Sequence, residues 1–112
     1  MTPEQRARFY YELAESVDEV QNKVTTIRCH GRLVSESVPE IRNLVKPLIE
    51  KGGRIVIDLT DLSQMDSSGL GALVGLKASA INAGYCRLEL INASGHVAEL
   101  LRITKLMQIF AS

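Results

Sequence analysis

The sequence predicts a single α/β domain, and three features lead to this prediction. At 112 residues, 46% of them hydrophobic, the chain has the length and apolar content of one domain with one core. Strand-like and helix-like segments follow each other in the order strand, strand, helix, strand, helix, strand, helix, strand. Such alternation is typical of parallel βαβ units. The chain shows no repeat, linker or low-complexity segment that would divide it.

The N-terminal region carries a helix-start signal. Thr2, Pro3 and Glu4 offer a hydroxyl cap, a proline at the first helical position and an acid in the first turn. Residues 1–13 are therefore expected to form a short helical extension, ahead of a main domain at residues 14–112. The stretch FYYELAESVDEV could instead begin a strand. Residues 15–20 are expected to form a hairpin with the β-branched residues 24–29.

A first long helix is predicted between positions 37 and 52. Ser37 and Glu40 have the spacing of a capping box, and Gly52-Gly53 can supply the positive φ that ends a helix. Pro47 falls off the apolar face and should kink the last turn. That face has the i, i+3, i+4, i+7, i+8 spacing and consists of Ile41, Leu44, Val45, Leu48 and Ile49.

The next predicted elements are a buried strand and a second long helix. Residues 55–57 are continuously apolar, which indicates a strand that is central in the sheet or covered on both faces. A helix should run from about Ser67 to Asn82 and stop at Gly84, with Leu76 off its core face. The expected core face consists of Leu70, Leu73, Val74 and Ile81. Because this helix is apolar nearly all round, it predicts either deep burial or a partner.

The C-terminal third should complete the alternation. Residues 87–92 alternate like a strand with one wetter face. Ser94-Gly95 should open a third helix with Val97, Leu100, Leu101 and Thr104 facing inward, and residues 106–110 should close the chain as a last strand.

Composition and charge exclude several classes of function. The 13 basic and 13 acidic residues balance, which argues against a nucleic-acid binder. Cys29 and Cys86 stand alone without metal-ligand spacing, so two buried thiols, no metal and a reducing compartment are expected. The N-terminus has no apolar signal segment, and Lys77 interrupts the one long apolar stretch. We therefore expect a cytoplasmic protein with no membrane insertion.

The segment QMDSSGLG, residues 64–71, joins the buried strand to the second helix and allows two interpretations. In the structural one, Ser67 caps the helix by accepting a hydrogen bond from a first-turn amide. In the functional one, a phosphate on Ser67 is tolerated by the helix N-terminus but repels a partner docked on the turn, to whose acidity Asp58, Asp61 and Asp66 already contribute.

Catalysis and nucleotide binding are not indicated by this segment. It lacks the glycine two positions before the serine that a nucleophile elbow requires. Neither His30 nor His96 has a carboxylate at an evident spacing, and no Walker-type motif occurs. We expect no enzyme activity and no cofactor.

At these residues the chain resembles the STAS domain family, in particular its bacterial anti-sigma factor antagonists. The resemblance covers about residues 25–110. Its most specific part is the block from Ile55 to Gly71, which contains D-L-x-x-L-x-x-M-D-S-S-G-L-G, and weaker parts are GRL at residues 31–33 and N-A-S-x-x-V-x-x-L-L from Asn92. It implies a mixed four- to five-stranded sheet with helices mainly on one face.

The resemblance also implies a partner-switching function. An unphosphorylated antagonist binds an anti-sigma factor, usually a serine/threonine kinase, and frees the sigma factor. The kinase phosphorylates the first serine after the motif aspartate, here Ser67 with Ser68 as the alternative, and a cognate phosphatase reverses the reaction. The expected partner contacts are Asp66, Ser67, Ser68, Gly69, Leu70, Arg32 and Leu33. Asp66 would position the hydroxyl, and Gly69 would let the partner approach the backbone.

The chain departs from the family pattern in two places. Many members carry an acidic residue just after G-x-L, whereas Val34 and Ser35 follow Leu33 here and position 32 is basic. The N-terminal extension is also longer than usual and could mediate a homodimer. The alternative hypothesis is a STAS docking or scaffold subunit of a stressosome or of a lipid-transport ABC system.

Overall fold

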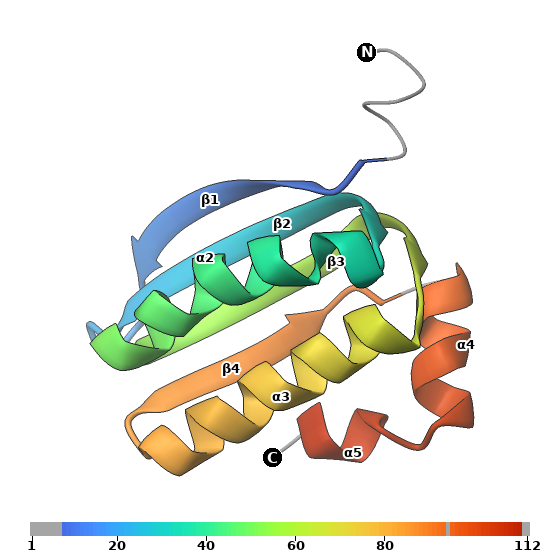
Figure 1. Ribbon diagram of the computed structural model, residues 1–112. Coiled ribbons are helices and arrows are strands. Elements are labelled where there is room, and N and C mark those ends of the chain that lie inside the picture. Colours follow the sequence, from blue (N-terminus) through green and yellow to red (C-terminus); the bar gives the residue numbers. More distant parts are fainter. Residues whose placement is uncertain (1–7, 94, 111–112) are drawn as a thin grey trace.

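Four strands form one mixed sheet in the computed structural model of the protein, which describes residues 8–93 and 95–110 (Figure 1). They are β1 Tyr10–Val17, β2 Lys23–Leu33, β3 Gly53–Met65 and β4 Cys86–Ile91. The strand order is β1-β2-β3-β4. β1 pairs with β2 antiparallel, whereas β2 with β3 and β3 with β4 pair parallel. The predicted mixed sheet is confirmed, with four strands.

The two long helices lie on one face of the sheet, as predicted. These are α2 Val38–Lys51, which follows a 3-10 turn η1 at Ser35–Ser37, and α3 Ser67–Ala83. Figure 1 shows α2 over β2 and β3 and α3 beside it along β4. The short helices α4 Gly95–Ile103 and α5 Met107–Phe110 lie beside α3 at the periphery. No helix of the described residues covers the opposite face of the sheet, which we call the open face.

The prediction of an N-terminal helix is wrong for the part of it that the structure describes. Tyr10–Leu13 belongs to β1, and β1 pairs with β2 from Tyr10↔His30 to Val17↔Lys23. Pairing with an existing strand overrides a local helix-start signal. The capping residues Thr2, Pro3 and Glu4 lie outside the described residues. The alternative of a strand in this segment, and its hairpin with the next strand, are confirmed.

Asp18 closes the hairpin between β1 and β2. Its Oδ1 accepts hydrogen bonds from the backbone of Val20 at 3.0 Å and of Asn22 at 2.9 Å. The bond from Asn22 is the main reason that the pKa of Asp18 is lowered. Gln21 takes a φ of 68° in this turn. The turn is thus fixed by a side chain that mimics a backbone acceptor.

The helix α2 forms where its apolar periodicity predicts, but Ser37 does not cap it. Ile41, Val45 and Ile49 are buried, and Gly52 ends the helix at a φ of 79°. The Ser37 hydroxyl instead donates to the carbonyl of Arg32 at 2.9 Å, so it ties the helix start to the end of β2. The predicted capping box with Glu40 is therefore wrong.

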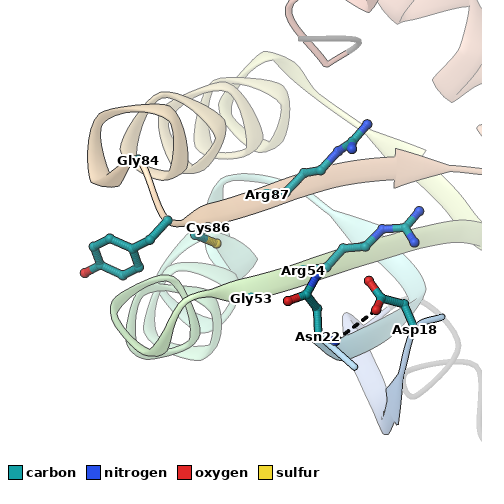
Figure 2. Close-up of a pocket in the computed structure, with 8 residues that line it drawn as sticks. Asp18, Asn22, Gly53, Arg54, Gly84, Cys86 and Arg87 are labelled. Carbon is teal, nitrogen blue, oxygen red and sulfur yellow. Dashed lines mark hydrogen bonds between the residues drawn. The ribbon is translucent and has the colours of Figure 1, made fainter. Parts of the chain in front are cut away.

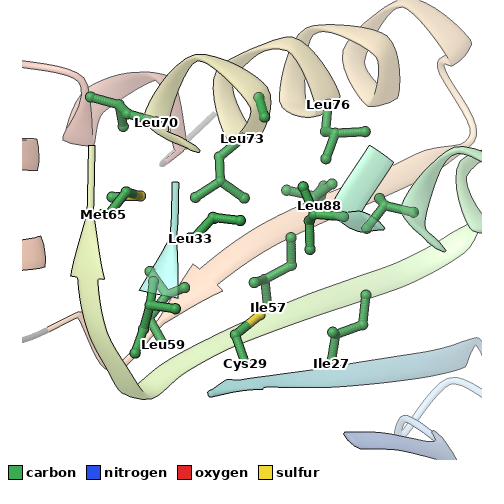
Figure 3. Packing of buried hydrophobic residues seen from close by; sticks show 14 of the residues in the cluster. Ile27, Cys29, Leu33, Ile57, Leu59, Met65, Leu70, Leu73, Leu76 and Leu88 are labelled. Carbon is green, nitrogen blue, oxygen red and sulfur yellow. The ribbon is translucent and has the colours of Figure 1, made fainter. Parts of the chain in front are cut away.

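The core lies between the sheet and the helices α2 and α3 (Figure 3). Ile55 and Ile57 of the central strand β3 are almost fully buried, which confirms the predicted buried strand. In α3, Leu76 is 2% exposed and belongs to the core, whereas Ile81 is 50% exposed, so both assignments are corrected. The helix contacts α2, β4 and α5 together. Its apolar character is therefore explained mainly by burial on several sides.

The prediction of a C-terminal strand is wrong, because the last described residues form the helix α5. A short apolar run does not distinguish a strand from a helix by its pattern. In α4, Val97 and Leu101 are buried as expected, but Thr104 is exposed beyond the helix end and its hydroxyl donates to the carbonyl of Leu100 at 2.8 Å. Position 94, expected to open the helix, lies outside the described residues.

Candidate functional site

The candidate site is the turn between β3 and α3. β3 ends at Met65, which is buried, and α3 begins at Ser67. The backbone amide of Asp66, between them, donates to the carbonyl of Leu33 at the end of β2 at 3.4 Å. The turn therefore lies at the carboxyl ends of two neighbouring parallel strands, where open α/β sheets commonly place their sites.

Asp66, and not Ser67, caps α3. Its Oδ1 accepts a hydrogen bond from the amide of Gly69 at 2.8 Å, and its Oδ2 accepts one from the amide of Ser35 at 3.3 Å. The first bond satisfies a free amide of the helix start. The second joins two segments 31 residues apart. The expected capping role of Ser67 is therefore wrong, and its hydroxyl is free of that task.

Gly69 is required by internal packing. A Cβ at this position would lie 2.1 Å from the carbonyl oxygen of Leu33, so only glycine lets the helix start meet the end of β2. Gly69, Leu33 and Leu70 are buried, with Leu33 and Leu70 in the core cluster. The structure places these three residues inside the domain, and their contacts with a partner stay a prediction.

Ser67 and Ser68 are both exposed in the first turn of α3. This turn contains no acidic residue, and α3 is a helix of 17 residues. The amides at a helix start carry a partial positive charge, which stabilises a nearby anion. Both hydroxyls are therefore exposed at a helix start, next to the carboxylate of Asp66.

Arg32 lies close to this turn. It lines a hollow of about 410 Å³ together with Asp66, Ser35 and His96. The Nε atom of Arg32 is buried and has no hydrogen-bond partner among the described residues. His96 Nε2 lies 3.1 Å from the carbonyl oxygen of Met65, which holds α4 against the end of β3. Of the expected contacts, the structure therefore brings Arg32 and Asp66 to one hollow beside Ser67.

Two of the acids that were expected to charge the turn have partners elsewhere. The carboxylate of Asp58 accepts hydrogen bonds from Thr60 and Asn92 and lies 3.7 Å from Arg28 Nε. Burial acts to raise the pKa of Asp58, but these bonds and the Arg28 charge outweigh it, so its pKa is lowered. Asp61 contacts His30 Nδ1. The expected acidity of the turn therefore rests on Asp66.

His30 has carboxylate neighbours that sequence spacing did not reveal. Its Nδ1 contacts Asp61, and its Nε2 lies 2.9 Å from Glu12 Oε1, an ion-pair distance without the alignment of a hydrogen bond. Tyr10 stacks on the ring, with centroids 4.6 Å apart. A catalytic triad needs a serine at the second ring nitrogen, which here faces Glu12. The arrangement links three strands and provides no nucleophile.

Lys77 is a buried charge whose place in the core was not expected. It is 2% exposed, and its Nζ donates to the carbonyl of Leu88 in β4 at 2.7 Å. Burial, followed by the charge of Arg87, lowers its pKa. The signal in the sequence was its spacing: Lys77 follows Leu73 by four positions and therefore lies on the apolar face.

A second hollow, of about 520 Å³, lies at the opposite end of the sheet, where β3 and β4 begin (Figure 2). Arg54 and Arg87 extend along its rim, and Asp18 lies beside Arg54. Both guanidinium groups already bind Glu89, at 2.7 Å and 2.8 Å. The two arginine charges of this hollow are therefore paired, and the hollow shares no lining residue with the hollow beside Ser67.

The fold and the turn define a class: a small mixed α/β domain with an exposed serine pair at the start of its second long helix. Residues 15–112 match the STAS domain, so the chain belongs to the STAS domain family. Within the described residues, no helix has both the length and the apolar character needed to span a membrane.

Several relatives carry a name that states a role. The chain is 36% identical to the anti-sigma-B factor antagonist of Bacillus subtilis, over 84% of this chain and 86% of that protein. It is 32% identical to the anti-sigma-B factor antagonist of Staphylococcus aureus, over 80% and 82%. It is also similar to the phosphorylated form of the Bacillus cell fate determinant SpoIIAA, with a TM-score of 0.61 and 26% identity over 83% of this chain and 85% of SpoIIAA.

Proposed function

We propose that this protein is a cytoplasmic anti-sigma factor antagonist whose binding is switched by phosphorylation of Ser67. In the unphosphorylated form it binds an anti-sigma factor serine/threonine kinase, and the sigma factor is freed. Phosphorylation of Ser67 blocks this binding, and a cognate phosphatase restores it. The relatives named as anti-sigma-B factor antagonists support the role, and the solved phosphorylated form of SpoIIAA supports the modification.

The observation that carries the proposal is the free hydroxyl of Ser67. Because Asp66 caps the helix, phosphorylation of Ser67 removes no structural hydrogen bond of the cap. A phosphate adds roughly two negative charges at pH 7, which the helix start tolerates. A partner that docks on the turn must instead desolvate the dianion, and like charges at an interface cost several kcal/mol. The fold persists while the contact is lost.

The proposed docking surface consists of Arg32, Asp66, Ser67 and Ser68. Arg32 lines the hollow beside the turn and contributes a positive charge to this surface. Asp66 holds the turn in place through Gly69 and Ser35. Ser68 is the matched control for Ser67, because it is also exposed in the same helical turn.

Incubation with the cognate kinase and ATP, followed by mass spectrometry, tests the acceptor. One phosphate is expected on Ser67, none in the S67A variant, and unchanged modification in the S68A variant. In a binding assay, S67D should remain folded by circular dichroism and bind the kinase at least about tenfold more weakly. Phosphorylation that persists in S67A and still controls binding would disprove the proposal. Co-purification with a permease ATPase in place of a sigma regulator would favour a docking subunit.

A further inference from the structure

Among the described residues, β1 is an outer edge of the sheet, and its only charged side chains are Glu12 and Glu15. It ends the strand order, and all eight of its residues pair with β2 in one unbroken register. Natural edge strands are commonly protected by charged side chains, above all lysine, or by proline, a bulge or short length. Tyr10–Val17 contains no lysine and no proline, and the register shifts of this sheet lie between β2 and β3. The outer edge can therefore accept another strand.

One face of β1 extends the apolar surface of the core, with Glu15 as its one acidic residue. Tyr11 pairs with Cys29 and Leu13 with Ile27, and both partners are fully buried. Directly paired residues point to the same face of a sheet, so Tyr11 and Leu13 face the helix side. Figure 1 shows β1 beyond α2, outside the helix layer. Tyr11, Leu13 and Val17 consequently remain 40%, 51% and 61% exposed.

The segment from Tyr10 to Asn22 is acidic and contains no lysine or arginine. Its acids are Glu12, Glu15, Asp18 and Glu19. Lys23 bridges Glu15 at 3.2 Å, and the side chains of Glu12 and Glu15 are both 64% exposed. A second copy of β1 would bring acidic residues beside acidic residues. A basic segment is the complementary occupant of this edge.

We propose that the free edge of β1 docks an extended, basic segment of another protein, which adds to the sheet as a fifth strand. Main-chain hydrogen bonds along the edge supply affinity, and alternate side chains supply specificity. The apolar side chains of the segment pack on Tyr11, Leu13 and Val17. Its lysines or arginines lie on the open-face side, near Glu12. This surface is distinct from the Ser67 turn and does not depend on the proposed function.

An octapeptide of alternating valine and lysine tests the proposal on the full ¹⁵N-labelled chain. NMR shift changes and amide protection should be confined to β1 and its neighbour β2. A peptide with glutamate in place of lysine should not bind. L13E should weaken binding at least tenfold, whereas I81E should leave it unchanged, because Ile81 is equally exposed but lies on α3. V17E provides a second variant if L13E fails to fold.

Four results would overturn the proposal. The first is that the NMR shifts of β1 do not change, and the second is that the two peptides bind equally well. The third is a concentration-dependent dimer that L13E abolishes. The fourth is that the outward-facing amides of β1 are already protected from exchange in the free monomer. The third would assign the edge to a second copy, and the fourth to a segment of the chain itself.

Discussion

Substituting Gly69 by alanine should destabilise the domain by displacing the start of α3. The new Cβ would lie 2.1 Å from the Leu33 carbonyl oxygen, whereas ordinary contact begins at 3.4 Å. Because a backbone atom blocks the way, the helix start must retreat by about 1.3 Å, the difference between these distances. This retreat strains the Gly69–Asp66 cap bond of 2.8 Å and the Asp66–Leu33 backbone bond of 3.4 Å.

The expected cost follows from these contacts. Overpacking costs about 1–3 kcal/mol, and loss of a cap costs about 0.5–2 kcal/mol. Alanine returns about 1 kcal/mol of helix propensity. The net loss in the free energy of unfolding should be about 0.5–4 kcal/mol, which is roughly 2–16 °C in Tm for a domain of this size.

Gly71 is the matched control, because it lies in the same helix and a Cβ there meets nothing within 4 Å. G71A should stabilise the protein by about 0.5–1 kcal/mol. Urea unfolding followed by circular dichroism at 222 nm (a conventional helix wavelength) suits a chain without tryptophan. If G69A were as stable as G71A, the close approach of α3 to the end of β2 would be refuted.

Three further predictions concern the cap, the buried lysine and the thiols. D66A should lose about 1 kcal/mol of unfolding free energy, but S67A less than about 0.5 kcal/mol, in the same urea assay; equal losses would restore Ser67 as the cap. K77M should exceed the wild type in stability at pH 7. This advantage should shrink toward pH 10, because the pKa of Lys77 is lower in the folded state than in the unfolded state, where it is about 10.4. The wild type therefore gains stability as the pH rises from the folded-state pKa to the unfolded-state pKa. A stability difference that does not change with pH would contradict the burial of a charged Lys77. Burial raises the pKa of Cys29 to about 12, so native Cys29 should not react with a thiol reagent at pH 8. Half-buried Cys86, whose pKa is also raised by burial, should react slowly. Rapid labelling of Cys29 before unfolding would count against its burial.

The elements that sequence analysis predicted well are those whose own residues carry the pattern. The periodic face of α2, the apolar run in β3 and the glycine stop at Gly84 each reflect local chemistry. The errors lie where tertiary pairing decides. β1 forms because β2 offers a partner strand. The apolar residues before Phe110 form the helix α5, and their run is too short for its pattern to distinguish a helix from a strand.

The candidate site was located from the sequence, but its internal roles were not. The position of the serine pair at the start of α3 followed from the strand-to-helix switch. That Asp66 takes the cap depends on the amide of Ser35, 31 residues earlier, and that position 69 must be glycine depends on the Leu33 carbonyl. Such contacts join distant segments and leave no periodic trace in the chain.

The bond between Asp66 and Ser35 has a consequence for any enzyme that modifies Ser67. The carboxylate holds the serine turn to a separate loop, so the hydroxyl is presented on a preassembled scaffold and not on a pliable strand of peptide. An excised peptide with the letters QMDSSGLG lacks that scaffold. Under the proposed function, the kinase would read the folded turn, and the domain would become a substrate only after it folds.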